Sequence, residues 1–167
     1  MRIIFFDAET FWSQVHSLTK MNPIVYALHP ETEIQSVAVR FDKPDSKTYV
    51  LFGAESIQKW VDSVDWSDVM VVGHNMSGFD SMLLAWRFGV KPKMWGCTLS
   101  MARPHYSKIC RLSLGALAKH LGFPDKGNIN ALNTKGLKLE DFTPAIRAQM
   151  KVYNATDTDL CYLLFPH

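Results

Sequence analysis

A short apolar run at residues 2–7 ends in acids, and this feature constrains the fold more than any other in the chain. The run is rich in isoleucine and phenylalanine and closes with Asp7, and Glu9 follows two positions later. Uninterrupted β-branched and aromatic residues are typical of a strand that is buried on both faces. Because alternate residues of a strand share a face, the sequence predicts that Asp7 and Glu9 lie together at the end of a central strand.

The rest of the chain alternates between strand and helix patterns. Apolar spacing and turn residues predict a hairpin of strands at 34–41 and 47–52, a strand at 68–72, helices at 54–64, 79–88 and 112–121, and a loop at 122–141 that includes Asn128 and Asn130. A last helix begins at Thr143 as N-cap, with Pro144 at its first position. With 167 residues, the chain has the length of one domain, so we expect a single α/β domain over residues 1–167.

Composition excludes several classes of protein. No apolar run approaches the ~20 residues of a membrane span, and an acid at position 7 comes too early for a signal peptide. The three cysteines, Cys97, Cys110 and Cys161, include no C-x-x-C pair, which disfavours a disulfide framework or a cysteine zinc site. We therefore expect no membrane partner and a location in the reducing cytoplasm.

The positive charge of the chain is concentrated in its middle third. The net charge is only +2, but residues 81–139 carry ten lysines and arginines against one acid. Such a block is either a solvated face or a surface for a polyanion such as nucleic acid. The second interpretation gains weight if acids elsewhere in the chain form a site for a phosphate-bearing substrate.

Two further acids occupy positions where the pattern predicts burial. Asp80 follows Phe79 at the start of a helix, and Asp157 lies on the apolar stripe of the last helix, four residues after Tyr153. Each acid also has an ordinary explanation: a helix cap for Asp80, a surface position for Glu9, or a lysine partner for Asp157. Taken together, four buried carboxylates favour a divalent cation as partner, and an all-oxygen ligand set suits Mg²⁺ or Mn²⁺.

Three short motifs carry a specific resemblance. Residues 7–10 match D-x-E-T, residues 75–80 match N-x-x-x-F-D, and residues 153–157 match Y-x-x-x-D. In this order and spacing, the chain resembles the DEDD superfamily of 3′–5′ exonucleases in its tyrosine form, because the position of the base in the histidine form is occupied by Val152. The stretch from Trp95 to Ala118 resembles the proofreading domains of phage-type family A DNA polymerases.

The resemblance implies a fold, an activity and a set of roles. It implies a ribonuclease-H-like mixed β-sheet flanked by helices and a metal-dependent, proofreading or DNA-degrading 3′–5′ exonuclease that acts on single-stranded or frayed DNA ends. Two Mg²⁺ or Mn²⁺ ions would be held by Asp7, Glu9, Asp80 and Asp157. Tyr153 would orient the attacking water, and substrate would contact Thr10, Phe11 and Asn75.

Other functions remain open at this point. A ribonuclease D-like exoribonuclease shares the Y-x-x-x-D motif, and a catalytically inactive exonuclease-like module would bind nucleic acid or a polymerase. The chain ends ten residues after Asp157 without polymerase sequence. We expect either a free-standing exonuclease, in the host cytoplasm if a phage encodes it, or a domain of a longer protein with a DNA polymerase as partner.

Overall fold

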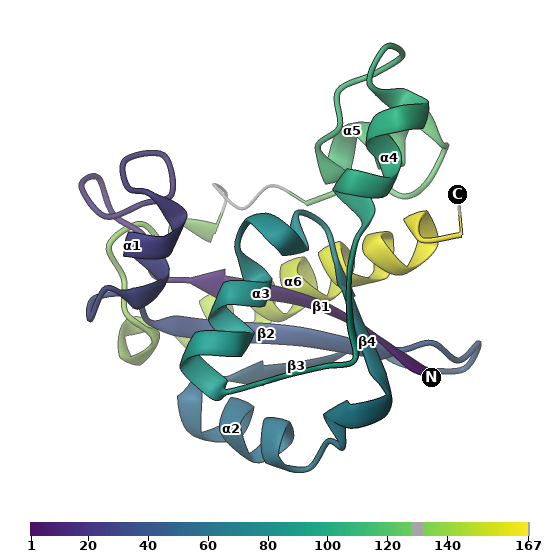
Figure 1. Ribbon diagram of the computed structural model, residues 1–167. Helices are drawn as coiled ribbons and strands as arrows, with labels where there is room; N and C mark the ends of the chain where they lie inside the picture. Colours follow the sequence, from purple (N-terminus) through teal and green to yellow (C-terminus); the bar gives the residue numbers. More distant parts are fainter. Residues whose placement is uncertain (128–131, 167) are drawn as a thin grey trace.

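The computed structural model describes residues 1–127 and 132–166, and Figure 1 shows a mixed β-sheet flanked by helices. The strands are β1 (Arg2–Thr10), β2 (Ile34–Phe41), β3 (Tyr49–Phe52), β4 (Val69–Gly73) and β5 (Met94–Cys97). Their spatial order is β3-β2-β1-β4-β5, with β1 antiparallel to β2 and parallel to β4. The first strand is therefore central, as the apolar run predicts.

Helices cover both faces of this sheet. On one face, Phe5 and Val72 pack against Cys161 of the long helix α6 (Pro144–Leu164), which runs behind the sheet in Figure 1. On the other face, Ile4 and Phe6 join a core that includes residues of α1 (Pro23–Leu28) and α2 (Ala54–Asp62). Odd-numbered residues of β1 thus face α6, and Asp7 and Glu9 belong to this series.

The central strand is longer than the sequence predicts. It continues to Thr10, because Asp7 pairs with Ala38 and Glu9 with Ser36 of β2, with a register shift between Glu9 and Thr10. The pairing of β1 with β4 covers only Arg2 to Phe5. The two parallel strands therefore separate where the acids begin, and the end of β1 forms one wall of an open space.

Most of the other predicted elements are present with shifted ends. The hairpin of β2 and β3, helix α2, strand β4, helix α5 (Leu114–His120) and helix α6 with its N-cap at Thr143 are confirmed. The helix predicted at 79–88 begins as α3 (Asp80–Met82) and continues with π-helical geometry at Leu83–Arg87. Within the predicted loop at 122–141, a 3₁₀ turn forms at Leu139–Asp141, while Asn128 and Asn130 lie outside the described residues.

Three elements of the structure have no counterpart in the sequence analysis. These are α1, β5 and α4 (Thr98–Tyr106). Strand β5 has four residues and α4 contains Pro104, so neither presents a long periodic pattern. Helix α1 did offer a signal, because the side chain of Asn22 accepts the Ile24 amide as an N-cap and Pro23 follows it.

None of the helices in the described part of the chain has the length and apolar character needed to cross a membrane.

Candidate active site

Three of the predicted acids converge between β1 and α6. Asp7 and Glu9 extend from the face of β1 that α6 covers, and Asp157 is 3% exposed on the facing side of α6. One carboxylate oxygen from each lies within 4.8 Å of the others. We call Asp7, Glu9 and Asp157 the acid cluster.

Asp80 enters the same space from a different element. It begins α3, is buried, and has hydrogen bonds with its own backbone and that of Ala8 in β1. Its carboxylate lines the same cleft as those of Asp7 and Glu9, and burial, followed by the charge of Asp7, raises its pKa. The fourth acid is therefore beside the acid cluster, although its oxygens do not belong to the tight group of three.

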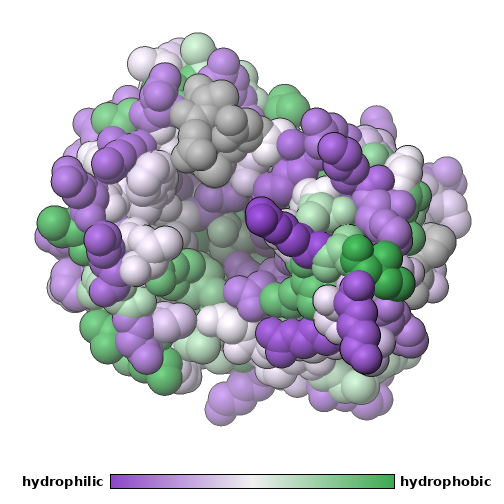
Figure 2. All heavy atoms as spheres, turned by 90° about the horizontal axis from the view of Figure 1, so that it is seen from above, coloured by the Kyte–Doolittle hydropathy of each residue, from purple (hydrophilic) through white to green (hydrophobic). Residues whose placement is uncertain are grey.

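Asp7, Glu9 and Asp80 line a cleft of about 610 Å³. Its walls are formed by the end of β1, by the loop at 12–20, and by side chains that include Tyr26, Asn75, Phe79, Lys135 and Tyr153. Figure 2 shows that the molecule is hollowed near the middle of the face seen from above, with many hydrophilic residues around the hollow. A polar polymer could therefore reach the acids from solvent.

Two of the three predicted substrate-binding residues line the cleft, and the third does not. Thr10 and Asn75 line the cleft, and Asn75 adopts a left-handed conformation with φ of 63°. Phe11 is only 8% exposed, and the next residue, Trp12, lines the cleft in its place. Of the two aromatic residues that follow Thr10, Trp12 is thus the one that reaches the cleft.

Tyr153 stands beside the acid cluster on α6. Burial and the negative charges of Asp157, Glu9 and Asp7 raise the pKa of its phenol, and its hydroxyl is hydrogen-bonded to Asp157. The phenol is therefore neutral at physiological pH and acts as a hydrogen-bond donor.

Sequence reasoning missed the residue that orients Asp7. The side-chain amide of Asn154 donates to Asp7 Oδ2 over 2.7 Å, and its own oxygen accepts the hydroxyl of Ser36 over 3.2 Å. Asn154 is fully buried and precedes Asp157 by three residues on the same helix. That spacing within the Y-x-x-x-D motif was the available signal.

The second missed contact comes from Lys126, which was predicted only as part of the basic block. Its ammonium group pairs with Asp157 Oδ2 and lies 5.3 Å from the centre of the Tyr153 ring. No sequence pattern joins Lys126 to α6, since the lysine lies in a segment without periodic structure. Tertiary packing brings this cation to the acids.

The environment of the acids raises their pKa values. Burial, followed by the charge of Asp157, raises the pKa of Asp7 from 3.8 to about 7, although Lys126 and Asn154 oppose the shift. Burial and neighbouring carboxylates also raise the pKa values of Glu9 and Asp80, and burial raises that of Asp157. The crowded acids therefore bind protons more tightly than isolated carboxyl groups do, and a bound cation would compete with those protons.

The donor set fits a divalent cation. Asp157 Oδ1 is buried and has no hydrogen-bond partner among the described residues. With all four acids ionised and Lys126 charged, the site would carry a formal charge of −3, which is costly in a partly buried place. Carboxylate oxygens are the ligands that Mg²⁺ and Mn²⁺ prefer, so the residues fit the ions that the sequence predicts.

Asp159 differs from Asp157 although the two acids are two residues apart. Its carboxylate pairs with Arg40 over 2.8 Å and accepts the hydroxyl of Thr48. A separation of two residues turns a side chain to another side of a helix, so Asp159 points away from the acid cluster.

Comparisons with known proteins identify the class of fold. No family model matches the sequence, and no curated protein matches it either. Among solved structures, the chain is similar to E. coli Exonuclease I in complex with a 5cy-dT13 oligonucleotide, with a TM-score of 0.55 and 12% sequence identity. The match covers 98% of this chain but only 39% of the longer protein. The fold is thus the predicted ribonuclease-H-like α/β fold.

Proposed function

We propose that this protein is a metal-dependent 3′–5′ exonuclease of the DEDD superfamily that hydrolyses phosphodiester bonds at the 3′ end of DNA. The convergence of Asp7, Glu9 and Asp157 within 4.8 Å is the observation that carries this proposal. The likeness to an exonuclease crystallised with an oligonucleotide supports DNA as the substrate.

Asp7, Glu9, Asp80 and Asp157 would hold two Mg²⁺ or Mn²⁺ ions, which supply charge stabilisation and an activated water when they are bound. Asn154 keeps Asp7 in place by donating to Oδ2, which leaves Oδ1 for a ligand. In the apo site, Lys126 neutralises part of the charge through Asp157. A cation that binds Asp157 would compete with this ion pair, so Lys126 tunes the affinity of the site.

Tyr153 supports the tyrosine form of the superfamily. Its neutral hydroxyl lies beside the acid cluster and has no role as a base, because burial and the surrounding carboxylates raise its pKa. We assign it the task of orienting the attacking water by hydrogen bonding. The water gives up one proton to solvent as its oxygen bonds to the phosphorus of the terminal phosphodiester. The bond between that phosphorus and the 3′ oxygen breaks, and the 3′ oxygen takes up a proton from solvent, which releases a nucleoside 5′-monophosphate.

The cleft provides contacts for the strand. Thr10 and Asn75 offer hydrogen-bonding groups, and Trp12 offers a ring for stacking. Lys135 Nζ lies 6.0 Å from the Trp12 ring centre, and Lys138 Nζ lies 3.9 Å from that of Phe11. Lys135 lines the cleft, and Lys138 lies next to Phe11, the neighbour of the cleft-lining Trp12, so both lysines would neutralise phosphates of a bound strand.

A proofreading role, a DNA polymerase as partner, and a cytoplasmic location stay predictions from the sequence. The first two rest on the resemblance of residues 95–118 to phage-type polymerase domains, and the location rests on the early acid Asp7 and on the cysteine pattern.

A gel assay tests the proposed activity directly. A 5′-labelled single-stranded DNA is incubated with the protein in Mg²⁺, Mn²⁺ or EDTA. We expect a ladder that shortens from the 3′ end only when metal is present, and the same assay with 5′-labelled RNA should show slower cleavage. Faster cleavage of RNA would favour a ribonuclease D-like enzyme, and DNA binding without cleavage in either metal would favour an inactive module.

A further inference from the structure

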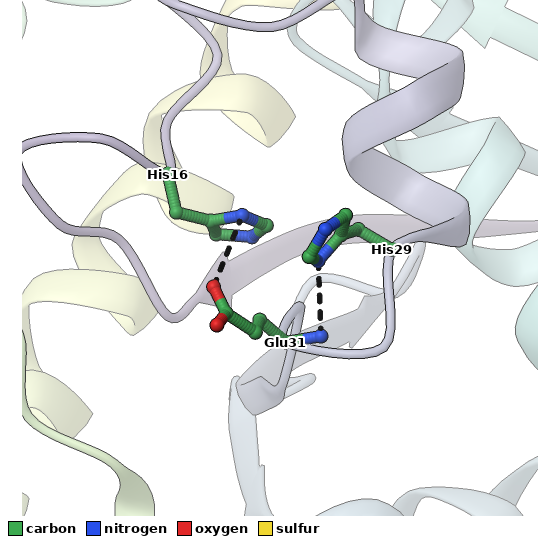
Figure 3. Close-up of side chains that lie close together, drawn as sticks. All are labelled: His16, His29 and Glu31. Atoms are coloured by element: carbon green, nitrogen blue, oxygen red, sulfur yellow. Dashed lines mark hydrogen bonds and ion pairs between the residues drawn. The ribbon is translucent and has the colours of Figure 1, made fainter.

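A second group of potential ligands lies outside the residues that line the acid cleft. It consists of His16, His29 and Glu31, which we call the histidine cluster (Figure 3). His16 belongs to the loop between β1 and α1, His29 is the C-cap of α1, and Glu31 lies in the turn before β2. One ring nitrogen of each histidine and one carboxylate oxygen of Glu31 lie within 4.8 Å of one another.

The hydrogen bonds around His16 fix the position of its proton. Thr32 donates its single hydroxyl hydrogen to the carbonyl of Tyr26 over 2.5 Å. The same hydroxyl oxygen lies 2.8 Å from His16 Nε2, so Nε2 must be the donor in that pair. In the neutral ring, the lone pair is therefore on Nδ1.

The lone pair on His16 Nδ1 faces a carboxylate oxygen of Glu31, which is itself a hydrogen-bond acceptor. His16 Nδ1 lies 3.7 Å from Glu31 Oε2, as the dashed line in Figure 3 shows. His16 is 2% exposed, and burial, with the charges of His29 and Lys138, lowers its pKa, although Glu31 opposes the shift. A neutral imidazole nitrogen and a carboxylate oxygen thus point at each other without a proton between them, an arrangement that a cation would stabilise.

His29 completes the cluster from the side of α1. Its ring centre lies 4.8 Å from that of His16, and its Nδ1 accepts the backbone amide of Glu31 over 3.2 Å. This long hydrogen bond holds the His29 ring beside Glu31. In the neutral ring the proton is then on Nε2, so a metal would bind His29 through Nδ1 in place of this hydrogen bond. Lys138 places a positive charge beside the histidine cluster, which disfavours a bound cation. Its ammonium group donates to the Glu31 carbonyl over 2.7 Å.

We propose that His16, His29 and Glu31 bind a divalent transition-metal ion, for which Zn²⁺ is the best match. Two histidines and one glutamate are an established type of zinc ligand set, in which solvent takes the fourth position, and imidazole nitrogen disfavours Mg²⁺. Ligand atoms around one zinc ion are about 3.3 Å apart, given bond lengths of about 2.0–2.1 Å. The Glu31 side chain is 61% exposed, so it is free to make this approach.

The position of the histidine cluster gives the ion a structural role. His16 lies within the loop whose residues Trp12, Ser13, Ser17 and Lys20 line the acid cleft. A metal bound to all three ligands would tie this loop to the C-terminal end of α1 and to the turn before β2. The ion would therefore hold one wall of the cleft in place without entering it.

Isothermal titration of Zn²⁺ tests the proposal. The titration is made on the folded protein in excess Mg²⁺ and in an Asp7→Asn background, so that zinc binding by the acid cluster is suppressed. We expect one Zn²⁺ per chain with a dissociation constant of about 1 µM or lower. His29→Gln and Glu31→Gln should each weaken binding by at least about tenfold.

The variants are chosen so that folding does not confuse the result. His29 is half-buried and Glu31 is exposed, so both variants should keep the wild-type circular dichroism melt, and His105→Gln is the control for binding by an exposed histidine. Zinc should also slow cleavage by trypsin after Lys20 in the control but not in His29→Gln. Absence of stoichiometric binding, or equal affinity in His29→Gln and His105→Gln, would overturn the site. Unchanged cleavage after Lys20 would overturn the structural role.

Discussion

The acid cluster and the histidine cluster are two groups of three potential ligands with opposite origins. The acid cluster joins β1 to α6 across most of the sequence, and its residues lie on regular elements in the interior. The histidine cluster joins residues only 15 positions apart, from Glu31 back to His16, on a loop, a helix end and a turn. Strand and helix periodicity predicted the first group, whereas no periodicity links the members of the second.

The chemistry of the two clusters differs as much as their origin. The acid cluster offers only oxygen and, among the residues that the structure describes, pairs with one ammonium group, that of Lys126, so it suits hard cations. The histidine cluster offers two nitrogens and one oxygen, which suits zinc. A chain can therefore keep two metals apart by ligand type, and each prediction below tests one side of this division.

The largest effect should come from Asp157→Asn. The substitution removes a charge from the acid cluster and keeps the shape of the side chain, so turnover should fall by about 10³-fold or more, while the metal-free melting temperature stays equal or rises because like charges are removed. Turnover is measured with labelled DNA in Mg²⁺, and melting by circular dichroism in EDTA.

Asp159→Asn is the matched control on the same helix. Its carboxylate pairs with Arg40 and Thr48, so turnover should stay near that of the wild type. Similar turnover losses in the two variants would show that the acid cluster is not the catalytic centre.

The next effect is that of Tyr153→Phe, which keeps the ring packed and deletes only the hydroxyl. Turnover should fall by about 10- to 10³-fold, less than for an acid, because positioning is lost while the ligands remain. Titration of Mn²⁺ should still show binding. If Mn²⁺ binding disappears, Tyr153 supports the ligands rather than the water.

A smaller effect is expected at Lys135, which lines the acid cleft, and at Lys138, whose ammonium group contacts the Glu31 carbonyl. The double variant Lys135→Met, Lys138→Met should bind single-stranded DNA more weakly. The slope of log K against log salt concentration should become less steep by about 1.4, because each of the two lost phosphate contacts accounts for ~0.7 of the slope. Binding is followed by fluorescence anisotropy in Ca²⁺. Lys59→Met, an exposed lysine paired with Glu55 on α2, is the control. An unchanged slope would leave these lysines as a solvated face.

The smallest effect concerns pH. The folded-state pKa of Asp7, about 7, exceeds its ordinary value of 3.8. Its stabilising contribution is therefore fully present below about pH 4 and is lost as the pH rises through about 7. Burial lowers the pKa of His74 from 6.5 to about 4. The contribution of His74 to stability therefore changes in the opposite direction and increases as the pH rises from about 4 to about 6.5.

Comparison of the wild type with Asp7→Asn isolates the contribution of the Asp7 carboxyl group to the pH dependence of stability. Melting temperatures in EDTA at pH 5 and pH 8 should show that the wild type loses more stability than Asp7→Asn as the pH rises. Mn²⁺ should raise the wild-type melting temperature more at pH 8 than at pH 5, because protons compete for the carboxylates. An equal gain at both values would contradict the raised pKa values.

Much of the architecture followed from local signals. The apolar run at 2–7 predicted the central strand, and Thr143 with Pro144 predicted the start of α6. Elements without such signals were missed. Strand β5 has only four residues, and its pairing with β4 stabilises an extended conformation that its own sequence does not predict. Short segments bury too little surface to form by themselves, so their structure depends on neighbours that a linear pattern does not reveal.

The sequence by itself determined the central strand, the long last helix and the four acids, because each is written as a periodicity or as a short motif. Only the tertiary structure decided which side chains surround those acids. Asn154 and Lys126 contact the acid cluster, Trp12 rather than Phe11 lines the cleft, and the histidine cluster forms between a loop and a turn. Periodicity reports which face of an element is buried, but the partner across that face comes from elsewhere in the chain, and only packing in three dimensions selects it.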